Sequence, residues 1–235
     1  MIENIEYTVA GRLFAGLLAT PEGTRASGRG VLVVHGGSGL GAHEREQATR
    51  LAALGYIALA PDLFGETFGD RARGMAVIGD LVASPGVLRA RITAAWTRLA
   101  AGPGVDPART VAVGHCFGGL AGFELARSGA DVRAVVGLHA GLAAREPARR
   151  GEVHARVLAC VGADDPFCPR DQRAAFEDEM TAAGVDWQLL ILANAKHGFS
   201  VPNIDETKQP GCAYHERSDT RSWRAMLELF DEVLD

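Results

Sequence analysis

A cysteine in the run Gly114-His115-Cys116-Phe117-Gly118-Gly119 has the setting of an enzymatic nucleophile. The apolar run 110–113 just before it predicts a buried strand, and helix-forming residues follow it. Glycines at 114 and 118 permit the tight strand-to-helix turn of the G-x-S-x-G motif, here with Cys in the Ser position. This turn lifts the side chain above the sheet, and a helix N-terminus favours the thiolate form. We therefore predict that Cys116 is a nucleophile and not an inert core thiol.

The other three cysteines lack this context. Cys160 lies inside an apolar run, which is typical of an inert core thiol, and Cys168 and Cys212 lie in predicted loops. No two cysteines form a C-x-x-C pair, and a chain of this size favours reduced thiols over a disulfide framework.

A nucleophilic thiol needs a base within hydrogen-bond reach and an acid that orients the base. In enzymes with this turn, the acid and then the histidine follow the nucleophile along the chain. Asp165 follows the strand predicted at 157–161, and His197 follows the last predicted strand. We therefore predict a triad of Cys116, Asp165 and His197. Asp164 is the alternative acid, although it could instead cap the following turn.

Other histidines compete with His197 for the role of base. His35 and His139 also follow predicted strands, but both precede the acid in the sequence. His115 adjoins the nucleophile, so its side chain is expected to point away from the sulfur. His197 is the best candidate.

Two backbone N–H groups are expected to form an oxyanion hole. One belongs to the residue after the nucleophile, Phe117, and the other comes from the loop after the first central strand, where we choose Gly37. This loop is glycine-rich, but neither G-x-G-x-x-G nor a P-loop lysine is present, so a phosphate cradle is not predicted.

Alternating strands and helices must position these residues. Strands are predicted at 31–34, 56–60, 110–113, 134–138, 157–161 and 187–192, and helices at 44–54, 87–100, 116–128, 170–183 and 215–234. A hairpin of 5–9 and 13–18 with Ala10-Gly11 at the turn precedes them. This pattern predicts an α/β fold in one domain, 1–235, with a mostly parallel central sheet and helices on both faces. Loops at 63–84 and 203–214 are expected to line the substrate site, near the carboxyl ends of the strands.

Composition excludes several classes of protein. The 235 residues are 47% hydrophobic and 23% charged, which excludes a disordered chain. With a formal net charge of −5 there is no basic excess to neutralise nucleic-acid phosphates. No apolar stretch is long enough to span a membrane, and no secretory signal precedes the first strand, so a cytoplasmic location is expected.

These residues resemble the dienelactone hydrolase family, a branch of the α/β-hydrolases. The matching sequence segments are Leu54-Gly55-Tyr56, Ala60-Pro61-Asp62-Leu63-Phe64-Gly65, the run 114–119, Gly162-Ala163-Asp164-Asp165-Pro166, His197-Gly198-Phe199 and Ser222-Trp223. The resemblance covers nearly the whole chain from about residue 10 onward. It implies hydrolysis of small ester or lactone substrates by a Cys-His-Asp triad, without a metal or organic cofactor. We expect a monomer or homodimer. We also assign Gly36 and Phe199 as substrate-contacting residues.

Two positions depart from the family pattern. In enzymes acting on dienelactone, a Glu after the first central strand holds the thiol proton at rest, and the matching residue here is Gly36. An Arg four residues after the catalytic His binds the substrate carboxylate, and that position here is Val201. Arg71 or Arg73 is a candidate for a second carboxylate-binding arginine. A substrate other than dienelactone is therefore expected.

The missing carboxylate leads to a prediction about the resting thiol. Without it, Cys116 is free to pair with His197 as a standing thiolate–imidazolium pair, unless Glu44 or Glu66 takes the place of the missing group.

Two other functions compete with hydrolysis: a thiol redox sensor in which Cys116 cycles through sulfenic acid, and a non-catalytic binding module.

Overall fold

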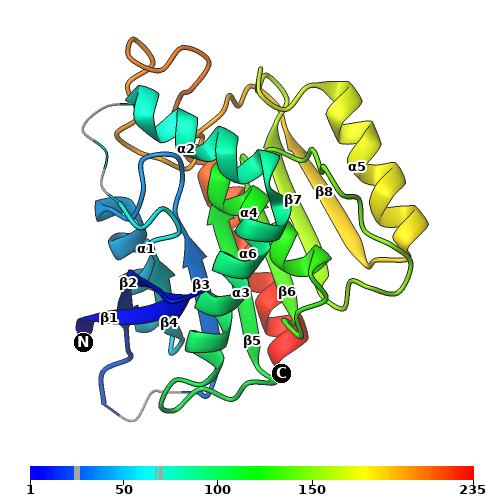
Figure 1. Cartoon of the computed structure of the whole chain (residues 1–235). Coiled ribbons are helices and arrows are strands. Elements are labelled where there is room, and N and C mark those ends of the chain that lie inside the picture. The colour runs from blue at the N-terminus through cyan, green and yellow to red at the C-terminus, as the bar shows by residue number, and fades with distance from the viewer. Residues whose placement is uncertain (24–26, 67, 69–70) are drawn as a thin grey trace.

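The computed structural model describes residues 1–23, 27–66, 68 and 71–235, and eight of its strands form one sheet (Figure 1). In chain order the elements are β1 (Ile2–Val9), β2 (Arg12–Ala19), β3 (Gly30–Val34), α1 (Ala42–Ala53), β4 (Ile57–Pro61), α2 (Arg71–Ala83), α3 (Pro85–Ala100), β5 (Thr110–His115), α4 (Phe117–Arg127), β6 (Ala134–Leu138), β7 (Arg156–Gly162), α5 (Arg170–Ala183), β8 (Trp187–Leu192) and α6 (Glu216–Leu234).

The sheet is antiparallel only at its N-terminal edge. Its strand order is β1-β2-β4-β3-β5-β6-β7-β8, and every pair from β4–β3 to β7–β8 is parallel. The predicted hairpin is confirmed: Ala10 and Gly11 both have positive φ, and Val9 pairs with Arg12. Positive φ at both central residues is typical of the two-residue hairpin turn whose backbone twist matches that of the flanking strands.

Helices cover both faces of the sheet, as the α/β pattern predicted (Figure 1). The strands β3, β4, β5 and β6 are buried along their whole length, which explains their continuous apolar sequences. One core lies under α2 to α5, with Leu88, Phe123 and Phe176 among its members. The other lies under α1 and α6, with Leu51 and Phe230.

The segment 63–84 is not the loop that the sequence predicted, because α2 occupies residues 71–83. Gly74 and Gly79 weaken the helical pattern of this segment, since glycine costs about 1 kcal/mol in a helix interior. Val77 and Leu81, four residues apart, are nonetheless buried in the core. Tertiary packing therefore outweighs the low local propensity.

Within the described part of the chain, no helix combines the length and the apolar character that crossing a bilayer requires.

Candidate active site

Cys116 lies at the point where β5 ends and α4 begins. Its backbone has φ of 53° and ψ of −117°, a conformation that L-residues rarely adopt. The Cys116 N–H donates to the carbonyl oxygen of Leu138, at the end of the neighbouring strand β6, over 3.0 Å. The residue is partly buried.

Two glycines make this turn possible. A Cβ on Gly114 would lie 2.1 Å from the backbone of Gly118, and one on Gly118 would lie 2.2 Å from the carbonyl oxygen of Val34 in β3. Backbone atoms cannot yield at such distances. The approach of α4 to β3 and β5 therefore excludes any side chain at either position.

Asp165 and His197 are joined by a hydrogen bond. Asp165 follows β7, its side chain is buried, and its Oδ2 lies 2.8 Å from His197 Nδ1. The other carboxylate oxygen, Oδ1, accepts the N–H of Phe167 over 2.8 Å. The neighbouring Asp164 is exposed. Of the two adjacent carboxylates, Asp165 is thus the one that contacts His197.

The rival histidines have other partners. His35 Nε2 accepts the N–H of Leu63 over 2.9 Å, which leaves Nδ1 to donate to the Gly36 carbonyl at 2.8 Å. The His115 ring meets His43 of α1 edge-on at a centroid distance of 4.6 Å and lies tilted against His139 at 5.8 Å.

His197 also hydrogen-bonds with Cys116, and this contact shifts the pKa of both side chains. Burial alone would raise the pKa of the Cys116 thiol. The hydrogen bond and charge of His197 and the backbone N–H groups of Phe117 and Gly37 outweigh burial and lower that pKa. Burial alone would lower the pKa of His197, but its bonds to Asp165 and Cys116 raise it to about 10. Both shifts favour the thiolate–imidazolium form.

The two amides chosen for an oxyanion hole therefore converge on the sulfur. Phe117 is the first residue of α4, and Gly37 lies in the loop after β3, beside Ile78 of α2. A group bonded to the sulfur would lie close to both donors.

Gly36 lies beside the nucleophile. A Cβ placed on Gly36 would be 3.7 Å from Cys116 Cβ, an ordinary contact distance. Both candidates for the missing carboxylate have other partners in the structure: Glu44 accepts the Gly41 N–H over 2.9 Å, and Glu66 pairs with Arg73. Arg73 is thereby paired as well, and the side chain of Arg71 lies outside the described residues.

Phe199 is not at a substrate-facing surface, contrary to the sequence-based expectation. Its ring has no exposed area and packs in the core under α6. The residue that the sequence analysis missed is Phe167, whose half-exposed ring meets the His197 ring edge-on at a centroid distance of 5.1 Å. Its position in the sequence, two residues after the predicted acid Asp165, could have indicated that Phe167 lies near the site.

The remaining cysteines are buried. Burial raises the pKa of Cys160 to about 12, and Cys168 and Cys212 are 1% and 3% exposed. No group of three metal-ligating side chains is arranged to hold an ion in the part of the chain that the structure describes.

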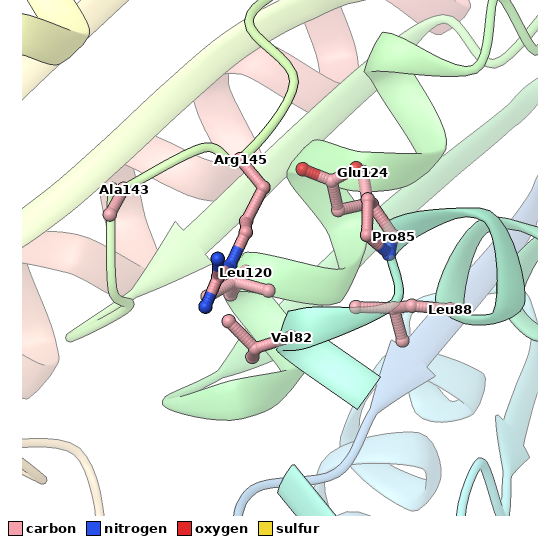
Figure 2. A pocket seen from close by; sticks show the side chains of 7 residues that line it. All are labelled: Val82, Pro85, Leu88, Leu120, Glu124, Ala143 and Arg145. Carbon is pink, nitrogen blue, oxygen red and sulfur yellow. The ribbon is translucent and has the colours of Figure 1, made fainter. Parts of the chain in front are cut away.

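A small hollow begins one helical turn beyond Cys116 (Figure 2). It is lined by Val82, Pro85, Leu88, Leu120, Glu124, Ala143 and Arg145. Figure 2 shows the guanidinium of Arg145 pointing towards Leu120, four residues after the nucleophile. The volume of about 10 Å³ is room for one water molecule and not for a substrate.

A mostly parallel sheet with helices on both faces and a strained Cys turn between β5 and α4 defines an α/β-hydrolase. The family model for the dienelactone hydrolase family matches residues 14–234. The chain therefore belongs to the dienelactone hydrolase family.

Two solved structures superpose closely on the whole chain. The protein m3DLH is 39% identical with a TM-score of 0.94, and the dienelactone hydrolase-like promiscuous phosphotriesterase P91 from metagenomic libraries is 37% identical with a TM-score of 0.93. Each alignment covers 100% of this chain and 99% of the other. A Salmonella typhimurium protein named "Putative carboxymethylenebutenolidase" is 28% identical over 215 residues, 85% of this chain and 76% of that protein.

Proposed function

We propose that the protein hydrolyses carboxylic esters or lactones through Cys116, His197 and Asp165. The observation that carries this proposal is the continuous hydrogen-bonded path from Asp165 to His197 to Cys116, with 2.8 Å between Asp165 Oδ2 and His197 Nδ1. Nucleophile, base and orienting acid are the three parts that acyl transfer by a thiol requires.

In the first half of the reaction, the Cys116 thiolate attacks the acyl carbon. The carbonyl oxygen becomes an oxyanion, which the N–H groups of Phe117 and Gly37 stabilise. The C–O bond then breaks, and His197 gives its proton to the leaving alcohol. In a lactone this alcohol stays attached to the acyl group.

In the second half, His197 removes a proton from water, and the hydroxide attacks the thioester. The C–S bond breaks, the carboxylic acid leaves, and the thiolate re-forms beside the imidazolium. Asp165 orients the imidazole in both halves.

Neutral short-chain esters and lactones are the proposed substrates. Val201 stands where an arginine would pair with a substrate carboxylate, so the bidentate, charge-assisted bond cannot form there. We expect kcat/KM for such neutral substrates to equal or exceed that for dienelactone. A much higher value for dienelactone would point to another arginine as the carboxylate ligand.

A secondary phosphotriesterase activity is the second candidate, because P91 is 37% identical over the whole chain. The same thiolate would attack phosphorus and displace one ester oxygen as an alcohol protonated by His197, while the same two amides hold the phosphoryl oxygen. Water activated by His197 would then cleave the P–S bond and release the phosphodiester. Loss of Cys116 should therefore abolish both activities. A phosphotriesterase activity that persists in Cys116→Ala would contradict a shared site.

The test is hydrolysis of p-nitrophenyl acetate with and without iodoacetamide. Cys116→Ala and His197→Ala should each reduce turnover by about 10³-fold or more, and the double variant should lose little further, because triad members act as a unit. Asp165→Asn should be severe, and its neighbour Asp164→Asn serves as the matched control.

Each alternative has its own outcome. Full activity in Cys116→Ala would overturn the mechanism, and a damaging Asp164→Asn would overturn the choice of acid. Peroxide-sensitive titration of Cys116 without turnover would favour a redox sensor, although the other cysteines are buried. Neither turnover nor thiol reactivity would favour a binding module.

A further inference from the structure

The His197 imidazole is in contact with a second, fully buried histidine at the end of β6. We propose that His139, held by Ser200, is a positioning residue that keeps the His197 ring in line between Asp165 and Cys116. The proposal rests on the function proposed above. It assigns His139 no contact with the substrate.

The contacts of His197 show what remains for a positioning residue to do. Hydrogen bonds to Asp165 and Cys116 fix its two ring nitrogens but leave the ring able to tilt about the line that joins them. The rings of His139 and Phe167 meet it at centroid distances of 5.2 and 5.1 Å, with interplanar angles of 70° and 82°. Phe167 is half exposed, whereas His139 is 1% exposed. His139 is thus the contact that cannot swing into solvent.

The backbone of His139 is strained and is joined to the nucleophile. Its φ is 42°, a conformation that costs free energy for any residue with a Cβ. Its N–H donates to the Cys160 carbonyl over 2.8 Å, and the preceding carbonyl, that of Leu138, accepts the Cys116 N–H. The turn that carries His139 therefore also anchors the nucleophile. Strain of this kind is maintained most often at functional sites.

The side chain of His139 is polar in a place where an apolar ring would pack. Its Nε2 lies 2.9 Å from Ser200 Oγ, and both side chains are buried. Its Nδ1 is buried and has no hydrogen-bond partner among the described residues. The hydrogen bond to Ser200 Oγ therefore holds one end of the buried ring in place.

The electrostatic surroundings suit a neutral ring beside an imidazolium. The titratable groups that face His139 are His197 and His115, with His43 beyond them, and the ring also contacts Ser200 and Phe199. Burial and these histidines hold the pKa of His139 well below its ordinary value. His139 therefore stays uncharged when His197 carries a proton, and it does not repel that charge.

The experiment compares kcat, KM and the pH dependence of Cys116 alkylation in four variants. His139→Ala removes the ring. His139→Asn also removes it but keeps a residue that tolerates positive φ, so it tests the ring contact if the alanine variant does not fold. Ser200→Ala removes only the hydrogen bond. His43→Asn, separated from His197 by the rings of His115 and His139, is the matched control.

We expect kcat for p-nitrophenyl acetate to fall about tenfold to a hundredfold in His139→Ala and His139→Asn, with a much smaller change in KM, as for a misplaced catalytic group. The midpoint of alkylation should rise towards that of a free thiol, since a loosened His197 stabilises the thiolate less. Ser200→Ala should change kcat and the alkylation midpoint in the same directions but by less. His43→Asn should change neither kcat nor the midpoint.

A merely structural role would lower thermal stability and leave the alkylation midpoint of the folded protein unchanged. Folded His139→Asn and Ser200→Ala proteins with wild-type kcat and midpoint would overturn the proposal. Failure of the proposed hydrolysis looks different, because the wild-type protein would then lack thiol-dependent turnover. The alkylation profiles would still show whether His139 controls the Cys116–His197 pair.

Discussion

The reactivity of a single sulfur atom depends here on a few neighbouring groups. His197, Phe117 and Gly37 all lower the pKa of Cys116 against the effect of burial, and the pKa of His197 rises to about 10. The thiolate therefore forms at a lower pH than in a free thiol, and the imidazolium persists to a higher pH than in a free histidine. We therefore predict that the thiolate–imidazolium pair is the resting state between these two limits.

This pair predicts the pH profile of alkylation. Iodoacetamide should react with the free enzyme at a midpoint below the ordinary thiol pKa of about 8.5. Gly36→Glu should raise that midpoint, because a carboxylate beside the sulfur disfavours the thiolate, and the Cβ at this position has room at 3.7 Å from Cys116 Cβ. Gly36→Gln, of equal size without charge, is the control. A wild-type midpoint at the free-thiol value, lowered by Gly36→Glu, would contradict the ion pair.

At the scale of elements, the strand-to-helix turn depends on how closely α4 approaches β3. A Cβ on Gly118 would lie 2.2 Å from the Val34 carbonyl oxygen, so α4 would have to move away from the strand. That movement would carry Cys116 and the Phe117 amide with it, because both lie at the start of the helix.

Gly118→Ala should therefore destabilise the fold by about 4 kcal/mol or more and abolish turnover. The matched change is Gly79→Ala on α2, where a Cβ meets nothing within 4 Å. This change should stabilise the protein by about 0.5–1 kcal/mol, since alanine favours a helix over glycine. Thermal unfolding and p-nitrophenyl acetate hydrolysis measure both effects. An active Gly118→Ala protein of normal stability would refute this account of the turn.

Over the whole molecule, the sheet separates two cores, and the elements that carry Cys116 belong chiefly to one of them. Cys116 packs against the core under α2 to α5, whereas Phe230 of α6 is fully buried in the other core, 6.1 Å from the ring of Tyr56. A change at Phe230 therefore leaves the core that packs against Cys116 itself in place.

Phe230→Ala should cost about 3–5 kcal/mol through lost burial and a new cavity. For a chain of this size that lowers Tm by about 6–20 °C, whereas kcat at 20 °C should stay near wild type. Glu228→Ala, exposed on the same helix, should change stability by less than about 0.5 kcal/mol. A parallel loss of kcat in the folded Phe230→Ala protein would show that α6 acts on the site.

Local sequence patterns alone predicted the alternation of strands and helices and the turn at Cys116. Continuous apolar runs such as 134–138 indicate strands buried on both faces, and glycines at 114 and 118 indicate a tight turn, because both signals depend on near neighbours in the chain. The order of Asp165 and His197 after the nucleophile was also readable from the sequence.

Only the tertiary structure decided which side chains meet. It brought Asp165 and not Asp164 to His197, placed Phe199 in the core, formed α2 despite its glycines, and set His139 beside His197. Adjacent residues in a turn have similar sequence contexts, and the direction of each side chain depends on packing against segments distant in the chain. Such contacts leave no periodic signal in the sequence, because they arise only when the strands and loops of the complete sheet come together.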